Sequence, residues 1–232
     1  MLGLNFLNAQ SSGNTGLNIV FEESSFKFTE PEKDLITKTI VLSEKEIRTL
    51  LPKLPKNIKI FLEIMDRDLF GVGGTTGRAQ KHEPDGEVYV YISNLYPNGI
   101  EGAVKASLAY TIHHEFHHLV RGWTMVGNKF GQGIDIAMVN EGLAVVFAEN
   151  STKQIFEGNS FPEEVVNWVD EILALPKNAN YNDWMNQHPD GRMGVGYRSG
   201  NFVVRKAMKD SGKNILEMSK LDPQEILELA GY

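Results

Sequence analysis

The chain has 232 residues, 41% of them hydrophobic, which suits one domain with a substantial core and excludes general disorder. Its formal charge of −7 and pI near 5.4 argue against a nucleic-acid partner or an anionic membrane surface, because both need clustered Lys and Arg. The absence of cysteine excludes disulfides, thiolate metal ligands and cysteine nucleophiles, and it leaves the redox compartment open.

The first 17 residues read as a flexible leader. No Lys or Arg precedes Lys27, and Asn5 and Asn8 interrupt the apolar run, so the segment lacks both regions of a signal peptide. No stretch approaches the length of a membrane span. We therefore expect one domain over residues 1–232 and no membrane partner, with the cytoplasm as the favoured compartment. The sequence does not indicate an oligomeric state.

The predicted elements begin with strands and end with helices. A helix is expected to start at Thr29, where a capping hydroxyl, a proline in the first turn and acidic residues lie together. Ser43 starts either a second helix or a continuation of the first. Alternating, β-branched segments predict strands at residues 18–23, 57–65 and 87–93. Further helices are predicted near residues 101–123, 135–150, 160–175, 180–187, 197–210 and 222–229.

A glycine-rich segment, GVGGTTGR, covers residues 71–78. It contains neither the Gly-Lys-Ser/Thr of a phosphate loop nor the GxGxxG of a dinucleotide site. Such glycines more often mark a bulge or a close backbone approach beside a ligand, and this is the interpretation we prefer.

Four of the six histidines lie in HHEFHH, residues 113–118. Two pairs have the helical i,i+4 spacing, His114 with His118 and His113 with His117. On a helical wheel the apolar residues form one arc centred opposite His114, and His118 lies beside His114. We therefore expect His114 and His118 to face a cleft, and His113 and His117 to lie on a polar flank, bonded to the backbone or a carboxylate. The apolar arc contains Leu108, Ala109, Ile112, Phe116, Leu119, Val120 and Trp123.

Residues 114–118 also form an HExxH motif, the only arrangement of these histidines with a carboxylate in reach. Two imidazoles one helical turn apart bind a single Zn²⁺ at about 2.0–2.1 Å, and the intervening Glu115 contacts the water as a general base. The alternatives are core histidines and a solvated polar face.

A catalytic zinc takes three protein ligands and keeps one position open. The segment AMVNEGLAVVFA, residues 137–148, carries a single charge, Glu141. A bare buried carboxylate is costly, so it needs a cation, and zinc held by His114 and His118 is the best one available. The alternative is an ion pair with Arg or Lys from elsewhere. Gly142 is expected to let this helix approach the histidine helix closely.

The motifs HHEFHHLVRG, NEGLAVVFAE, GYRSGNFVVRKAMKDSG and LDPQEIL resemble the predicted zinc-dependent proteases of bacteria typified by YjaZ-like proteins. The similarity runs from Gly71 to Leu229, roughly two thirds of the chain. A glutamate ligand 23 residues after the second histidine is the arrangement of the gluzincin metallopeptidases. One departure is Val145, which stands where the thermolysin-like pattern has an aspartate that binds a ligand histidine.

The resemblance also implies a Tyr or His that holds the developing oxyanion. The candidates are Tyr197, in GYRSG, with Arg198 and His188 behind it. We favour Tyr197, and the alternative for it is aromatic packing on the core. The strand at residues 87–93 and its glycine-rich approach resemble the zincin cleft edge, where an extended peptide adds as a strand.

The sequence therefore predicts an α+β, zincin-like fold: a small mixed β-sheet packed on the HExxH helix, with a mainly helical C-terminal half. The predicted function is zinc-dependent peptide-bond hydrolysis of a peptide or protein substrate. Zn²⁺ is held by His114, His118 and Glu141, and Glu115 and Tyr197 are the catalytic residues. The alternatives are a non-catalytic metal-binding or chaperone-like module and a structural protein whose histidines bind nothing.

Overall fold

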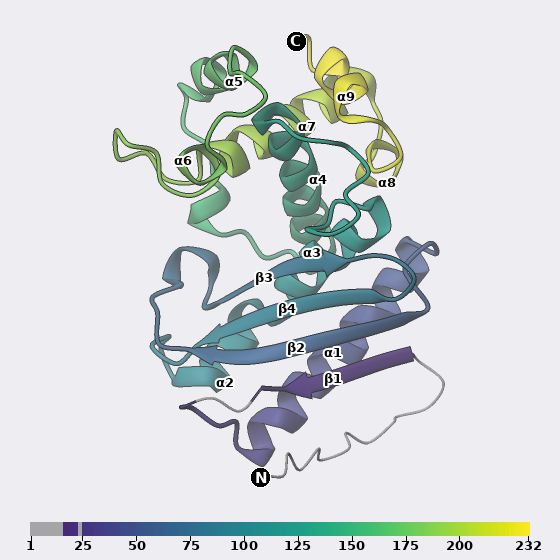
Figure 1. Cartoon of the computed structure of the whole chain (residues 1–232), viewed down its shortest axis with the longest axis vertical. Coiled ribbons are helices and arrows are strands. Elements are labelled where there is room, and N and C mark those ends of the chain that lie inside the picture. The colour runs from purple at the N-terminus through teal and green to yellow at the C-terminus, as the bar shows by residue number, and fades with distance from the viewer. Residues whose placement is uncertain (1–15, 23–24) are drawn as a thin grey trace.

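The computed structural model describes residues 16–22 and 25–232. One sheet crosses the lower half of the molecule and a group of helices fills the upper half (Figure 1). Residues 1–15 of the predicted leader lie outside the described residues. Its last two residues, Gly16 and Leu17, belong to the first strand. The strands are β1 (Gly16–Phe21), β2 (Asn57–Met65), β3 (Thr75–Lys81) and β4 (Gly86–Ser93).

The sheet is mixed, with strand order β1-β2-β4-β3. β1, β2 and β4 are parallel, while β3 is antiparallel to β4 and forms the edge nearest the helical half (Figure 1). The three predicted strands are present as β1, β2 and β4. However, the prediction that residues 87–93 form the edge was wrong, because β4 is central. The edge strand is β3, whose sequence TTGRAQK has too little apolar alternation to be recognised.

The first helix, α1 (Glu30–Leu50), is continuous, so Ser43 continues a helix and does not start one. Its start is fixed by the expected capping box between Thr29 and Glu32. Ile36, Ile40 and Ile47 lie on one side of it and are fully buried. α1 lies behind the sheet (Figure 1), and its buried isoleucines belong to the same hydrophobic core as the alternate buried residues of β2 and β4.

The histidine helix runs through the interior between the sheet and the helical half. It begins as α2 (Gly99–Ala103), passes through a π-helical segment at Val104–Leu108, and continues as α3 (Ala109–Arg121). It ends where Gly122 adopts a left-handed φ of 75°. Because β3 and β4 pack on one side and α4 (Ile134–Thr152) on the other, nearly every side chain of α3 is buried.

The second central helix, α4, is buried along almost its whole length. Gly142 does permit a close approach, but to α7 (Val195–Ser211) and not to the histidine helix as expected. A Cβ at Gly142 would lie 2.2 Å from the backbone carbon of Gly200, and one at Gly200 would lie 1.9 Å from the carbonyl oxygen of Met138. The two glycines therefore let α4 and α7 cross at backbone contact.

The remaining helices surround α4 and α7 in the upper half (Figure 1). The predicted helices of this half are all present with shifted ends, and one additional short helix, α8, was not predicted. Among the described residues, no helix is long and apolar enough to cross a membrane. The helices are α5 (Val165–Leu173), α6 (Tyr181–Met185), α8 (Ile215–Met218) and α9 (Pro223–Leu229), with short 3-10 turns at Phe70–Val72 and Glu157–Asn159.

Candidate metal centre

Three side chains from two helices converge in the interior. The Nε2 atoms of His114 and His118, both on α3, lie 3.0 Å apart, and each is 3.1 Å from Oε2 of Glu141 on α4. All three residues are buried. They are the one group of three or more potential metal ligands found among the described residues. The structure thus brings together the three residues that the sequence pointed to.

Helix geometry accounts for this convergence. The i,i+4 spacing places both imidazoles on the side of α3 that faces α4. Glu141 is directed at them from α4, and its second oxygen, Oε1, accepts a 2.8 Å hydrogen bond from the indole Nε1 of Trp123. Trp123 follows directly after the end of α3, so both carboxylate oxygens are held by residues of one short segment.

The electrostatics favour a cation at this point. Burial alone raises the pKa of Glu141, but His118 and His114 outweigh burial and hold that pKa well below its ordinary value. The carboxylate is therefore charged although it is buried. A buried negative charge needs a positive counterpart. Among the residues that the structure describes, no Lys or Arg pairs with Glu141, whose ion-pair partners are the two histidines.

The donor set fits zinc. Imidazole nitrogen and carboxylate oxygen bind Zn²⁺ at about 2.0–2.2 Å, so two tetrahedral ligands lie about 3.3 Å apart, close to the separations of the three donor atoms. Protons alone satisfy the triad poorly, since two Nε2 atoms in contact cannot both direct a proton at each other. A shared cation removes this conflict. Three protein ligands also leave a fourth position for water or substrate.

Glu115 lies beside the triad against the edge strand. A Cβ on Gly77 of β3 would approach the Cγ of Glu115 to 2.7 Å, so glycine is required at this contact. The amide of Ala79 donates toward the carboxylate, while its Oε2 atom has no hydrogen-bond partner among the described residues. Burial raises the pKa of Glu115 to about 7. The glycine-rich segment therefore makes the expected close backbone approach, and the group that it approaches is the side chain of Glu115.

Hydroxyl groups hold β3 against the histidine helix. The Thr75 hydroxyl contacts the Ser107 hydroxyl at 2.8 Å and the Thr111 hydroxyl at 2.6 Å. The Thr75 amide also donates to Ser107 at 3.1 Å. Ser107 and Thr111 lie on the His114 side of the helical wheel, so this side both carries the candidate ligands and fixes the edge strand next to them.

Tyr197 lies close to the site, at the start of α7. Burial raises its pKa well above the ordinary value, with the nearby Glu141 carboxylate acting in the same direction, so the phenol stays protonated. Its hydroxyl hydrogen-bonds that of Tyr181, the first residue of α6. Met185, one turn further along α6, packs so closely on Gly196 that a Cβ there would lie 2.0 Å from its sulfur. This contact holds the two tyrosines side by side.

The other two candidates for the oxyanion are engaged elsewhere. His188 pairs with Asp190 at 2.8 Å and packs edge-on against Trp184. Arg198 donates to the carbonyl of Ser160 and lies over the ring of Trp168. Tyr197 is thus the candidate that the structure brings into the neighbourhood of the triad.

His113 and His117 are not on a polar flank, and this expectation was wrong. Both are buried, and both rings pack against Phe147 of α4. As expected, His113 bonds the backbone, since its Nδ1 lies 2.7 Å from the Ala109 carbonyl oxygen. His117 Nε2 lies 2.8 Å from the Ser219 hydroxyl. The helical wheel failed because α3 is covered on all sides and no flank reaches solvent.

Sequence reasoning missed Trp123 and Tyr181. Trp123 was placed in the apolar arc, where its indole N–H carried no visible signal, and Tyr181 begins the short helix α6, about 40 residues after Glu141, with no motif around it. The sequence has Val145 where the thermolysin-like pattern has an aspartate, and the structure shows the consequence for a ligand histidine. Val145 is fully buried, and Nδ1 of His118 has no hydrogen-bond partner among the described residues.

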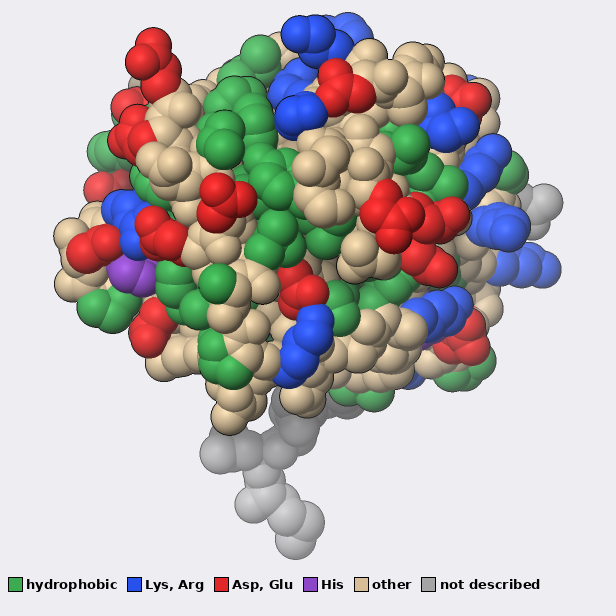
Figure 2. All heavy atoms as spheres, turned by 90° about the horizontal axis from the view of Figure 1, so that it is seen from above, with side chains coloured by type: hydrophobic (Ala, Val, Ile, Leu, Met, Phe, Trp, Pro, Cys, Tyr) green, Lys and Arg blue, Asp and Glu red, His purple; other side chains and the backbone are tan. Residues whose placement is uncertain are grey.

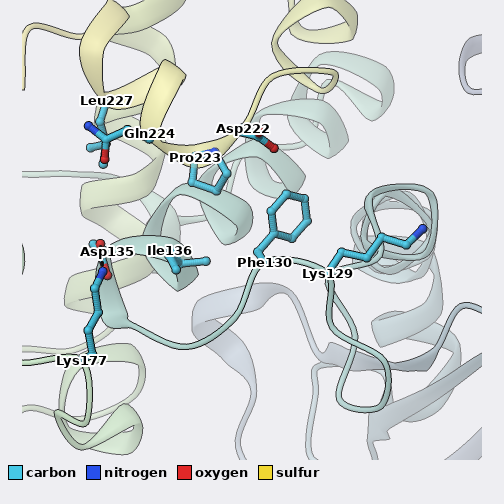
Figure 3. A pocket seen from close by; sticks show the side chains of 9 residues that line it. All are labelled: Lys129, Phe130, Asp135, Ile136, Lys177, Asp222, Pro223, Gln224 and Leu227. Carbon is cyan, nitrogen blue, oxygen red and sulfur yellow. Dashed lines mark hydrogen bonds and ion pairs between the residues drawn. The ribbon is translucent and has the colours of Figure 1, made fainter.

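Two surface cavities lie away from the triad. One, of about 350 Å³, lies between the segment before α4 and the start of α9 (Figure 3). The other, of about 440 Å³, lies beside Phe202 and Arg205 of α7. Neither contains a residue of the triad or Glu115, so we assign neither to chemistry. The first cavity is lined by Lys129, Phe130, Asp135, Ile136, Lys177, Asp222, Pro223, Gln224 and Leu227.

On the face of the helical half, acidic and basic side chains are interspersed around a hydrophobic band (Figure 2).

A His-His-Glu set with a free carboxylate oxygen beside it defines a class of site, the candidate hydrolytic metal centre. The chain belongs to the family described as predicted Zn-dependent protease (DUF2268), whose model matches residues 41–228. This match confirms the resemblance seen in the motifs and extends it toward the N-terminus, over the second half of α1 and all of β2. No curated protein and no solved structure showed a significant match to the chain.

Proposed function

We propose that this protein is a zinc-dependent peptidase of gluzincin type with a zincin-like arrangement of sheet and helices. One observation carries the proposal: three zinc-type donor atoms converge within 3.1 Å, beside a glutamate with one oxygen that no described residue bonds. The family description supports the same chemistry. A structural metal site would need no such glutamate.

Each residue has a defined task in this proposal. His114, His118 and Glu141 hold the metal, and Trp123 fixes the orientation of the Glu141 carboxylate. Zn²⁺ bound there lowers the pKa of a water molecule and polarises a carbonyl group. Glu115 accepts the proton of the attacking water on its free oxygen and returns it to the leaving amine. Tyr197 donates its phenolic hydrogen to the oxyanion that forms on the substrate.

The edge of β3 supplies a place for an extended substrate. The Ser93 amide donates to the Gly74 carbonyl, so by alternation the backbone groups of Thr75, Gly77 and Ala79 point away from β4. The Thr75 amide is already bonded to the Ser107 hydroxyl. The Ala79 carbonyl accepts from the Met125 amide, and the Ala79 amide donates to the Glu115 carboxylate. Within the described part of the chain no backbone bond outside the sheet is found for Gly77, so its N–H and C=O can bond a peptide backbone directly beside Glu115.

The test is hydrolysis of a mixed peptide library by the zinc-loaded protein, the Glu115→Gln variant and a matched control. Glu115→Gln keeps the shape and removes the base, so cleavage should fall by about 10²–10⁴-fold while zinc content stays at one equivalent. Glu44→Gln is the control, because Glu44 is an equally buried glutamate that pairs with Arg48 of α1. It should keep its activity.

The outcomes separate the alternatives. Zinc binding without cleavage of any peptide would favour the metal-binding module. Loss of zinc in Glu115→Gln would make Glu115 structural. Full activity of the zinc-loaded Glu115→Gln variant would rule out the assigned general base.

A further inference from the structure

We infer that the turn between α8 and α9, residues Ser219 to Asp222, is a positioning element for the metal ligands, and that Arg121 transmits its position to them. This inference rests on the proposed metal site and assigns a role to the LDPQEIL motif, which the proposed chemistry leaves unused. The turn is about 100 residues beyond the histidines in sequence but in direct contact with their helix.

Arg121 connects three segments at the point where they meet. Its Nη1 donates to the carbonyl oxygens of Ser219 and Leu221, both at 2.8 Å. Its Nε donates to Oδ1 of Asn140 at 3.1 Å. The side chain is 8% exposed, so these bonds form in a shielded environment. One guanidinium therefore ties the turn to α3 and to α4 together.

The position of Arg121 relative to the ligands matters. It lies three residues after His118 on α3, and its partner Asn140 immediately precedes Glu141 on α4. Asn140 is fully buried and donates its own amide to the Ile136 carbonyl, so its side chain has no freedom to move. His118 and Arg121 lie on the same turn of α3, and Asn140 and Glu141 are neighbours on α4. The bond from Arg121 to Asn140 therefore fixes the separation of these two turns, and with it the distance from His118 to Glu141.

His117 provides a second connection to the same turn. The Ser219 hydroxyl donates its single proton to the Ile215 carbonyl at 2.7 Å. It must therefore accept from His117, which places the proton of that ring on Nε2. His117 and Arg121 lie on either side of His118, so the turn is bonded to the helix both before and after this ligand.

The guanidinium of Arg121 has two further neighbours, Asp222 and Phe130. Burial lowers the pKa of Arg121 to about 10, and Asp222 at the end of the turn acts in the opposite direction; the guanidinium carbon lies 4.6 Å from the centroid of the Phe130 ring. Arg121 is thus oriented by three oxygen acceptors and an aromatic ring. Such a surrounding suits a rigid connector more than a simple surface ion pair.

The experiment compares zinc affinity, by chelator competition, in wild type, Arg121→Gln, Arg121→Lys and Ser219→Ala. Removing an outer partner of a metal ligand lowers metal affinity by about 10–100-fold, and we expect a loss in this range for Arg121→Gln. Arg121→Lys keeps the charge but cannot bond all three acceptors, so it should not restore the affinity. Ser219→Ala removes one bond, and we expect a smaller loss. It also guards against a folding failure of the arginine variants.

A second measurement excludes a merely structural role. With Co²⁺ in place of zinc, the visible absorption spectrum reports ligand geometry, and it should change in Arg121→Gln. Arg48→Gln is the matched control, because Arg48 also donates to three oxygen acceptors, here the backbone carbonyls of the loop between α1 and β2, and it contacts no residue of the triad. It should lower the melting temperature and leave both zinc affinity and the cobalt spectrum unchanged.

The possible failures are distinct. A wild type that binds no zinc would overturn the proposed metal site itself. A wild type that binds zinc, with Arg121→Gln and Ser219→Ala at the same affinity and with the same cobalt spectrum, would overturn only the role of the turn.

Discussion

Helix α3 carries two histidine pairs with the same spacing, and the structure gives them different surroundings. His114 and His118 converge on the Glu141 carboxylate, whereas His113 and His117 pack against the ring of Phe147. All four are buried, so burial does not distinguish the pairs. The difference lies in the residue that α4 presents to each pair, a carboxylate in one case and an aromatic ring in the other.

The two pairs also differ in charge. Glu141 is held charged by the histidines beside it, as its lowered pKa indicates. Burial lowers the pKa of His113 and, to a greater extent, of His117, so these rings are neutral and each uses a proton for a neutral acceptor. A metal cation is therefore favoured on one side of α3 and disfavoured on the other. The facing carboxylate, more than the histidine spacing, therefore distinguishes the candidate metal-binding pair from the other pair.

The largest effect is expected from removing one of the candidate ligands. We expect Glu141→Ala and His118→Ala to lose the metal, from close to one equivalent of zinc per chain to almost none after dialysis, because two remaining ligands hold zinc weakly. Elemental analysis of protein purified without a histidine tag measures this directly. Retention of zinc in His118→Ala, together with its loss from His117→Ala, would show that the pairs were assigned the wrong way round.

The next largest effect concerns Tyr197, to which the proposed function assigns a role in the chemistry and none in metal binding. We expect Tyr197→Phe to lower kcat by about 10²-fold or more with zinc content unchanged, since one oxyanion donor contributes about 2.7–4 kcal/mol. Steady-state kinetics on a peptide found by library screening provide the measurement. Tyr181→Phe is the matched variant, because it removes the hydroxyl that bonds Tyr197. An equal loss in Tyr181→Phe alone, with Tyr197→Phe unaffected, would transfer the role to Tyr181.

Trp123 sharpens the comparison on the side of the carboxylate. Trp123→Phe keeps an aromatic ring and removes the 2.8 Å hydrogen bond to Oε1 of Glu141. We expect about tenfold weaker zinc binding in a chelator competition, at the lower end of the range for lost outer partners. Unchanged affinity would mean that the histidines alone orient Glu141.

The predicted site came mostly from local sequence patterns. HExxH fixes the positions of His114, Glu115 and His118 on one helix, and helix geometry then dictates which of them share a side. Glu141 was recognisable as the single charge in an apolar helix, because such a charge needs a partner. These inferences need no knowledge of how the helices cross.

Features that depend on tertiary packing could not be predicted in this way. Gly142 has the appearance of a close-approach residue, but the sequence does not say which helix approaches, and the answer was α7. β3 has almost no strand signal, since its edge position is stabilised by Ser107, Thr111 and the loop at Met125. The polar flank expected for His113 and His117 was wrong because a wheel describes one helix and not what covers it.

The smallest effect on the metal is expected at His113, and it tests the neutral side of the comparison. His113→Ala removes a ring that bonds the Ala109 carbonyl of its own helix, lies 3.7 Å from a carboxylate oxygen of Glu46 on α1, and packs on Phe147. The truncation leaves a space in the core and should lower the free energy of unfolding by about 1–3 kcal/mol, measured by denaturant titration. Zinc should stay at one equivalent with an unchanged affinity, because no bond connects His113 to the triad. His117→Ala should also retain one equivalent of zinc, but with weaker binding, because His117 bonds the turn at Ser219. An equally large fall in zinc affinity in His113→Ala and His117→Ala would contradict this assignment. It would mean that core packing controls the metal site, and that the particular partners of each histidine do not.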